Sequence, residues 1–192
     1  MLATSSDQPF RSGAGRMCLD FIRTLRHRGR PDAEEELGSP VRVDAWIRQF
    51  GPCDCQGRHP PPDRDVTARA LREAINALVT AAHSAAGISS CPTSVRQSVN
   101  TAAAYPPPEP YLDGEGRLSF RADDPVAATL ALTARDALDL VSSSELARMR
   151  SCANPDCRVL FVDHSRPGTR RWCSMQTCGN QAKKSAQRAR NT

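Results

Sequence analysis

The sequence predicts a mostly α-helical protein with one small β-hairpin, in which a helical N-terminal domain (residues 1–145) precedes a cysteine-rich module (residues 146–192). Aromatic residues make up 5% of the chain while Ala, Leu and Arg are frequent, a composition that favours helices because sheets draw on aromatic and β-branched residues. Half of the eight cysteines fall in two pairs near the end of the chain. A chain of 192 residues can bury one core and carry a small extra module.

The first predicted helix covers residues 17–25, where apolar side chains recur at helical spacing. Residues 26–36 are charged and interrupted by Gly and Pro, which predicts a loop. A second helix begins at Ser39-Pro40 and ends before Gly51-Pro52, because Pro suits a first helical turn and Gly-Pro stops it. Residues 52–63 contain four prolines and are predicted to form a loop.

The clearest predicted helix covers residues 66–85. Five of its residues follow spacings of three and four and are predicted to face the core: Ala70, Leu71, Ala74, Leu78 and Ala82. Residues 87–104 are weakly patterned. Residues 111–120 surround a glycine-containing turn and predict the hairpin.

Asp124 followed by Pro125 is typical of a capped helix start, and a long apolar helix is predicted after it. Its core-facing residues are Leu130, Ala134, Ala137, Leu138 and Val141. A short helix is predicted over residues 144–150, directly before the cysteine-rich module.

Charge is distributed unevenly along the chain. The formal net charge is +5, yet residues 151–192 alone hold eight Lys and Arg against two Asp, a net of +6. The remaining residues are therefore close to neutral. This asymmetry predicts a polyanionic partner for the module, with a merely solubilising basic tail as the alternative.

Cysteine use indicates a reducing location. Neither an export signal in residues 1–15 nor a stretch long enough to span a membrane is visible, which predicts a cytoplasmic protein without membrane contact. In that compartment clustered cysteines are more often metal ligands or catalysts than disulfides.

Four cysteines have the spacing of a metal site. Cys152 and Cys157 enclose four residues, as do Cys173 and Cys178, and fifteen residues connect the pairs. Zinc takes four such ligands in a tetrahedron, and paired cysteines on two tight turns supply them. The first pair encloses turn residues and the second opens a helix, so the expected module is a treble-clef-like or zinc-ribbon-like finger holding one zinc ion per chain.

Metal is also needed for stability, because the module has too few large apolar residues for a core of its own. Structural zinc contributes on the order of 10 kcal/mol or more in zinc-finger peptides. His164 is a weaker candidate ligand. Four thiolates around zinc leave a net charge of −2, which Arg158, Arg170 and Arg171 could offset instead of contacting nucleic acid.

The helix expected after Cys178 is basic and has no acidic partners of its own. Such a helix suits a phosphate track or a groove of nucleic acid. The predicted nucleic-acid contacts are Arg170, Arg171, Lys183, Lys184, Gln187, Arg188 and Arg190.

Residues 150–183 resemble the CGNR zinc finger: Cys152-Ala153-Asn154-Pro155-Asp156-Cys157, then Leu160 to Arg166, then Arg170 to Lys183. In that family the finger follows an ABATE domain, whose usual opening motif residues 17–25 resemble. The resemblance implies four cysteine zinc ligands, a DNA-contacting helix and a role in stress-induced transcriptional regulation. The family's name-giving arginine is Gln181 here. If that arginine contacts phosphate in the family, the contact would be lost in this chain. If it packs against the zinc site, the change would have little effect.

Other sites and functions carry weaker patterns. Cys53-Asp54-Cys55 with His59 could form a second metal site, while Cys18 and Cys91 are expected to be buried. Asp20 and His27 could line a ligand pocket, although a helix cap and a surface histidine are the simpler interpretation. The sequence contains none of the common catalytic motifs. A zinc ion with four cysteine ligands has no coordination position left for a substrate, so we do not predict an enzyme.

Three functions compete. The first is a DNA-binding transcriptional regulator whose helical domain senses a small ligand or a partner. The others are an RNA-binding zinc-ribbon protein and a zinc-stabilised protein-interaction module. A single finger covers little surface, so a homodimer is expected for a regulator.

Overall fold

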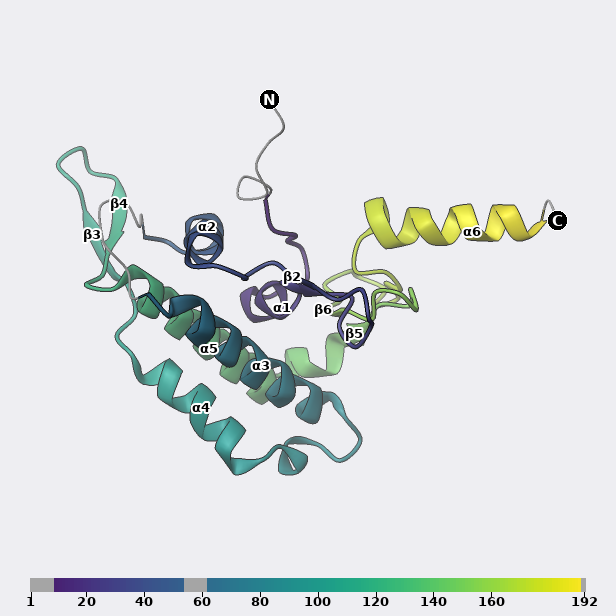
Figure 1. Ribbon diagram of the computed structural model, residues 1–192, viewed down its shortest axis with the longest axis horizontal. Helices are drawn as coiled ribbons and strands as arrows, with labels where there is room; N and C mark the ends of the chain where they lie inside the picture. The colour runs from purple at the N-terminus through teal and green to yellow at the C-terminus, as the bar shows by residue number, and fades with distance from the viewer. Residues whose placement is uncertain (1–8, 54–61, 191–192) are drawn as a thin grey trace.

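Three helices, α3 (Arg64–His83), α4 (Thr93–Ala104) and α5 (Pro125–Ser142), pack side by side and form most of the core (Figure 1). The computed structural model describes residues 9–53 and 62–190, the side chains of residues 189 and 190 excepted. Two shorter helices, α1 (Met17–Ile22) and α2 (Pro40–Phe50), pack on α3 and α5. The predicted mostly helical fold is confirmed.

Helix α5 begins as its sequence predicts. The Asp124 carboxylate accepts hydrogen bonds from the backbone N–H groups of Val126 and Ala127, at 2.9 and 3.0 Å. Four of its buried residues are alanines at spacings of three (Ala128, Ala131, Ala134 and Ala137), each fully buried. These small side chains let α3 and α4 approach closely, so α5 lies at the centre of the body.

The buried face of α3 differs from the predicted stripe. Leu71 and Leu78 are buried as expected, but Ala70 is exposed. The residues that complete the buried face are Ala68, Ile75 and Val79. Alanine is small enough to be tolerated on either face, so the larger aliphatic residues decide which side faces the core.

Helix α4 lies in the weakly patterned region and was not predicted. It buries Val99 and Ala103, too few apolar residues to produce a clear period. The 3₁₀ turn η2 (Ile88–Ser90) precedes it.

The segment predicted as a loop over residues 26–36 contains a short antiparallel ladder between β1 (Leu25–Arg26) and β2 (Glu34–Glu35). Helix α1 accordingly ends at Ile22 and not at Leu25. Two-residue strands carry too little pattern to be recognised from sequence.

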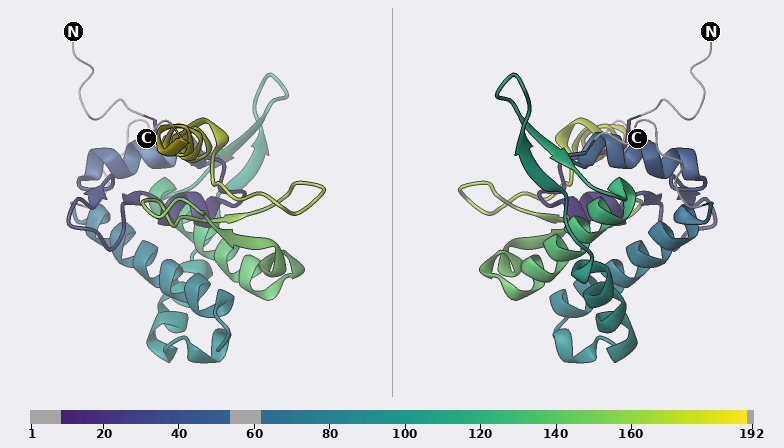
Figure 2. Two further views of the ribbon diagram at one scale, coloured as in Figure 1. Left: turned by 90° about the vertical axis from the view of Figure 1, so that its right-hand side faces the viewer. Right: turned by 90° about the vertical axis from the view of Figure 1, so that its left-hand side faces the viewer.

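The predicted hairpin is present as β3 (Glu109–Leu112) and β4 (Leu118–Arg121), with Tyr111 opposite Ser119. It stands at the end of the molecule opposite the C-terminal helix α6 (Asn180–Arg190) (Figures 1 and 2). Residues 144–150 form the 3₁₀ turn η3 (Ser144–Arg148) instead of a full helix, and the chain continues into β5 (Met149–Ser151).

Strand β5 pairs with β6 (Leu160–Val162), and this pair joins the finger to the body. The Val162 N–H donates to the Ala14 carbonyl at 2.8 Å. Gly15 beside it has φ +93°, and a Cβ there would lie 3.1 Å from the Val162 carbonyl oxygen, so this close approach requires glycine. Phe161 and Met149 are fully buried in the same core as the helices.

Arg16 ties the start of α1 to α5 and η3 with ion pairs to Asp136 and Glu145, both 2.8 Å long. Across residues 9–53 and 62–190, none of the helices combines the length and apolar character that a membrane crossing requires.

Candidate metal centre

The first cysteine pair lies on a tight turn after β5. The Asn154 side-chain oxygen accepts a hydrogen bond from the Asp156 N–H at 3.0 Å, and the Asn154 carbonyl accepts from the Cys157 N–H at 2.9 Å. Arg158 follows with φ +50°, in the left-handed region. The turn closes when the Cys152 N–H donates to the Val159 carbonyl at 2.9 Å. These bonds direct both sulfur atoms to one side of the turn.

The second pair opens the C-terminal helix, as predicted. The Ser174 hydroxyl accepts a hydrogen bond from the Thr177 N–H, capping one turn of π-helix, η4 (Met175–Gly179), that leads into α6. The Ala153 N–H donates to the Arg171 carbonyl at 2.9 Å, which ties the two turns together.

The four cysteine sulfur atoms meet in one cluster. All lie within 4.8 Å of one another. Cys157 Sγ is 3.6 Å from Cys173 Sγ, and Cys173 Sγ is 3.7 Å from Cys178 Sγ. A tetrahedron with zinc–sulfur bonds of 2.3 Å has edges of about 3.8 Å. The sulfur positions therefore fit one zinc ion held by Cys152, Cys157, Cys173 and Cys178.

The environment of the cluster suits thiolate ligands. Cys152, Cys173 and Cys178 are buried, and Cys157 is half-buried. The Cys173 N–H points at Cys152 Sγ, 3.5 Å away, which stabilises a negative sulfur. The hydrogen bond between Cys157 and Cys173 lowers the pKa of Cys157 and raises the pKa of Cys173, because one thiol keeps the proton that the other releases. A bound zinc ion would be held by all four sulfur atoms as thiolates, so binding it would release their protons.

Four protein ligands close the coordination shell, so the zinc is structural: it fixes the turns and leaves no position for a substrate. His164, the alternative ligand, lies outside the cluster, with its Nε2 3.3 Å from the Gly15 carbonyl oxygen.

Arg170 and Arg171 lie beside the zinc cluster but differ in their contacts. The Arg170 guanidinium donates to the carbonyl oxygens of Trp172 and Cys173 and lies over the Phe161 ring, 4.7 Å from its centroid. Arg170 thus stabilises the finger itself. Arg171 is exposed, and its guanidinium carbon lies 5.1 Å from the centroid of the Trp172 ring.

Helix α6 carries the remaining predicted nucleic-acid contacts and projects away from the body (Figure 1). Lys183, Lys184, Gln187 and Arg188 are exposed on it. Within the described part of the chain, neither Lys183 nor Lys184 has an ion-pair partner. The side chain of Arg190 lies outside what the structure describes.

Gln181 lies beside the zinc turn. Its side-chain oxygen accepts a hydrogen bond from the Asn154 side-chain amide at 2.9 Å, and Asn154 shapes the first cysteine turn. Gln181 thus lies where a residue that packs against the zinc site would lie, which is the second of the two roles considered for this position. Asn154, which the sequence predicts as a turn residue, therefore also connects the first cysteine turn to α6.

The other candidate residues are placed as follows. Cys18 and Cys91 are buried as predicted. Asp20 accepts hydrogen bonds from the Gly13 and Ala14 N–H groups and so holds the segment that meets β6. The second metal candidate lies outside the described residues, apart from the buried Cys53.

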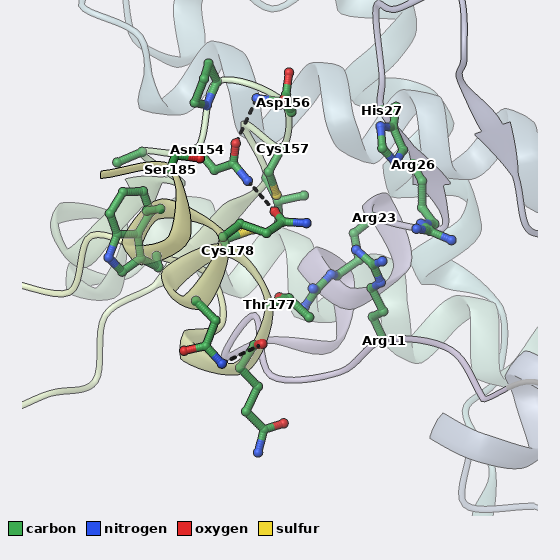
Figure 3. A pocket seen from close by; sticks show the side chains of 18 of the residues that line it. Arg11, Arg23, Arg26, His27, Asn154, Asp156, Cys157, Thr177, Cys178 and Ser185 are labelled. Carbon is green, nitrogen blue, oxygen red and sulfur yellow. Dashed lines mark hydrogen bonds between the residues drawn. The ribbon is translucent and has the colours of Figure 1, made fainter. Parts of the chain in front are cut away.

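A cavity between the body and the finger adds residues that sequence reasoning missed, among them Arg11, Arg23 and Arg26 (Figure 3). They lie more than 120 positions from the finger residues that they face, so no local pattern could have found them.

Two families match the chain. The ABATE family, described as "Putative stress-induced transcription regulator", matches residues 15–144, more than half of the chain. The family described as CGNR zinc finger matches residues 148–191, which include all four clustered cysteines. No curated protein matches the sequence. The chain therefore belongs to the ABATE family and carries a CGNR zinc finger that holds one zinc ion.

Proposed function

We propose that the chain is a cytoplasmic, non-enzymatic regulator of transcription that binds DNA through α6, with a helical body that senses a small ligand. The observation that carries the proposal is the exposed basic face of α6, which follows the zinc cluster directly. The zinc-held turns fix where this helix starts, and its sequence contains no acidic residue. Lys183 and Lys184 are exposed and have no ion-pair partner among the described residues, so they are available to neutralise phosphates.

The family descriptions support regulation of transcription and a nucleic-acid partner. A single short helix buries little DNA surface, so we propose that two chains bind together. The closed zinc shell supports a structural and not a catalytic metal.

The test is a titration of the zinc-loaded full chain against a fluorescent mixed-sequence duplex over a series of salt concentrations. Binding through α6 should weaken steeply with salt. Replacing Lys183 with Ala should lower the affinity and reduce the slope of log K against log salt by about 0.9, the value for one phosphate contact in duplex DNA. Alanine keeps the helix intact.

Arg117→Ala is the matched control, since Arg117 is exposed on the hairpin at the opposite end of the molecule. An unchanged slope for Lys183→Ala would contradict the assignment of α6. Preference for single-stranded RNA over duplex would support an RNA-binding protein, and absence of binding to both would support a protein-interaction module.

A further inference from the structure

A cavity of about 860 Å³ lies between the body and the finger (Figure 3). One wall comes from the segment around α1 and β1 and carries five basic side chains: Arg11, Arg23, Arg26, His27 and Arg30. The facing wall comes from the first cysteine turn and the start of α6 and includes Asn154, Trp172, Gln181 and Lys184.

Basic side chains outnumber acidic ones in the lining of this cavity. Among the described residues that line it, Asp156 is the one carboxylate, and it pairs with Arg30. Carboxylates outside the lining also pair with its arginines: Asp20 with Arg23, Glu34 and Glu36 with Arg26, and Asp32 with Arg30. Two zinc-site cysteines, Cys157 and Cys178, lie in the lining as well. Cations that converge on a concave surface focus a positive potential there and attract an anion.

Three side-chain nitrogen atoms in the basic wall are buried without a hydrogen-bond partner in the described structure: Arg23 Nε, Arg26 Nε and His27 Nδ1. The Arg23 side chain is only 5% exposed, and its other contacts are to Ser12 and Asp20 through one terminal nitrogen. Buried donors are almost always paired, because an unpaired one has lost its water without compensation. These three atoms are themselves enclosed, so an anion in the cavity would contact the same side chains through their other atoms.

The backbone around His27 is also unusual. Its φ of +51° lies in the left-handed region that non-glycine residues seldom adopt. His27 Nδ1 is 3.6 Å from Asp32 Oδ2, beyond hydrogen-bond length.

We infer that this cavity binds a small phosphorylated organic molecule. Arginine suits phosphate because its planar guanidinium offers several donors at once. The volume is within the usual range for small-molecule sites, and Pro155, Val159 and Trp172 offer apolar surface for the organic part. The inference rests on the proposed ligand-sensing role of the body.

A bound molecule would contact both the body and the proposed DNA helix. Gln181 and Lys184 belong to the first turns of α6 and line the cavity. Occupancy would thereby couple the basic wall to the position of α6. A DNA phosphate is the less favoured occupant, because α6 extends away from the body beyond its first turns, which line the cavity (Figure 1).

The test observes the arginine side chains directly. Full-length zinc-loaded protein labelled with ¹⁵N is titrated with inorganic phosphate, and the Nε–Hε resonances are followed by NMR. Arg23→Lys, Arg26→Gln and Arg48→Gln assign the three resonances. Acetate and chloride at matched ionic strength are the reference anions, and zinc content with the helical signal at 222 nm verifies folding of each variant.

We expect phosphate to shift the Arg23 and Arg26 resonances saturably while the Arg48 resonance, on the exposed face of α2 outside the cavity, stays in place. Arg26→Gln should weaken phosphate binding about tenfold or more, as expected for the loss of one charged hydrogen bond. Arg48→Gln should leave the affinity unchanged.

Equal shifts with phosphate and chloride, absence of saturation, or a preference for acetate would overturn the inference. Equal losses of phosphate and duplex affinity in Arg26→Gln would assign the cavity to DNA instead. Duplex binding is measured on the same preparation without phosphate. Intact duplex binding with no phosphate site refutes only this inference, and the reverse result refutes only the proposed DNA binding.

Discussion

Replacing Phe161 with Ala should destabilise the body helices as well as the finger. Phe161 lies on β6 in the finger, is fully buried, and belongs to the same core as α1, α3 and α5. Truncating a buried phenylalanine to alanine costs about 3–5 kcal/mol. Loss of the contact with the Arg170 guanidinium adds about 0.5–1 kcal/mol.

The assay is thermal unfolding followed at 222 nm, with excess zinc, so that the signal reports mainly on the body helices. For a chain of this size about 1 kcal/mol corresponds to 2–4 °C, which gives an expected decrease in Tm of roughly 10 °C. Leu118→Ala is the control, because Leu118 is 63% exposed on the hairpin, and its Tm should stay within about 2 °C of the wild type.

An unchanged body transition in Phe161→Ala, combined with weaker zinc binding, would refute this reasoning. It would show that residues 146–192 form a separate folding unit. The sequence suggests such a unit, whereas the structure shows Phe161 and Met149 buried among body residues.

Three further predictions follow from single contacts. Asp163→Asn should weaken the loop before Cys173, because the buried carboxylate accepts from the Ser165 and Arg170 N–H groups at 2.9 and 2.8 Å. The Ser165 hydrogen bond lowers the pKa of Asp163 to about 2, so its contribution is present above about pH 4 and is lost only as pH falls through about 2. Urea unfolding should therefore give a constant difference between wild type and variant from about pH 8 to about pH 5. Asp124→Ala should lower the free energy of unfolding by about 1 kcal/mol through loss of the α5 cap, measured by the same method, and an unchanged value would contradict the cap's role. Chelation of zinc should lower the Tm at 222 nm because the finger shares the core, and an unaffected Tm would contradict this.

The features predicted correctly from the sequence are those with local causes. Asp124-Pro125 fixes the start of α5 through contacts within three residues, and the two cysteine pairs need only tight turns and a short connector to meet. The zinc cluster was predictable for this reason. Ala70 was assigned to the wrong face of α3 because alanine carries little information on burial, and α4 was missed because it buries only Val99 and Ala103.

The basic cavity could not be predicted, because it depends on how distant segments meet. Arg23 is a polar residue within the predicted helix over residues 17–25 and carries no signal of burial, yet it lies buried opposite the zinc finger. The need for glycine at position 15 likewise depends on the Val162 carbonyl, which approaches it closely only in the folded protein. Such contacts follow from tertiary packing and leave no periodic pattern in the sequence.

In the proposed function, one zinc ion orders the finger and thereby presents α6 to DNA. Its most direct test is duplex binding, followed by fluorescence anisotropy, while zinc is added stepwise to the metal-free full chain. The account predicts that binding rises with zinc and stops rising at one equivalent per chain, matching the four-cysteine cluster. Equal duplex binding by the metal-free and the zinc-loaded protein would contradict it.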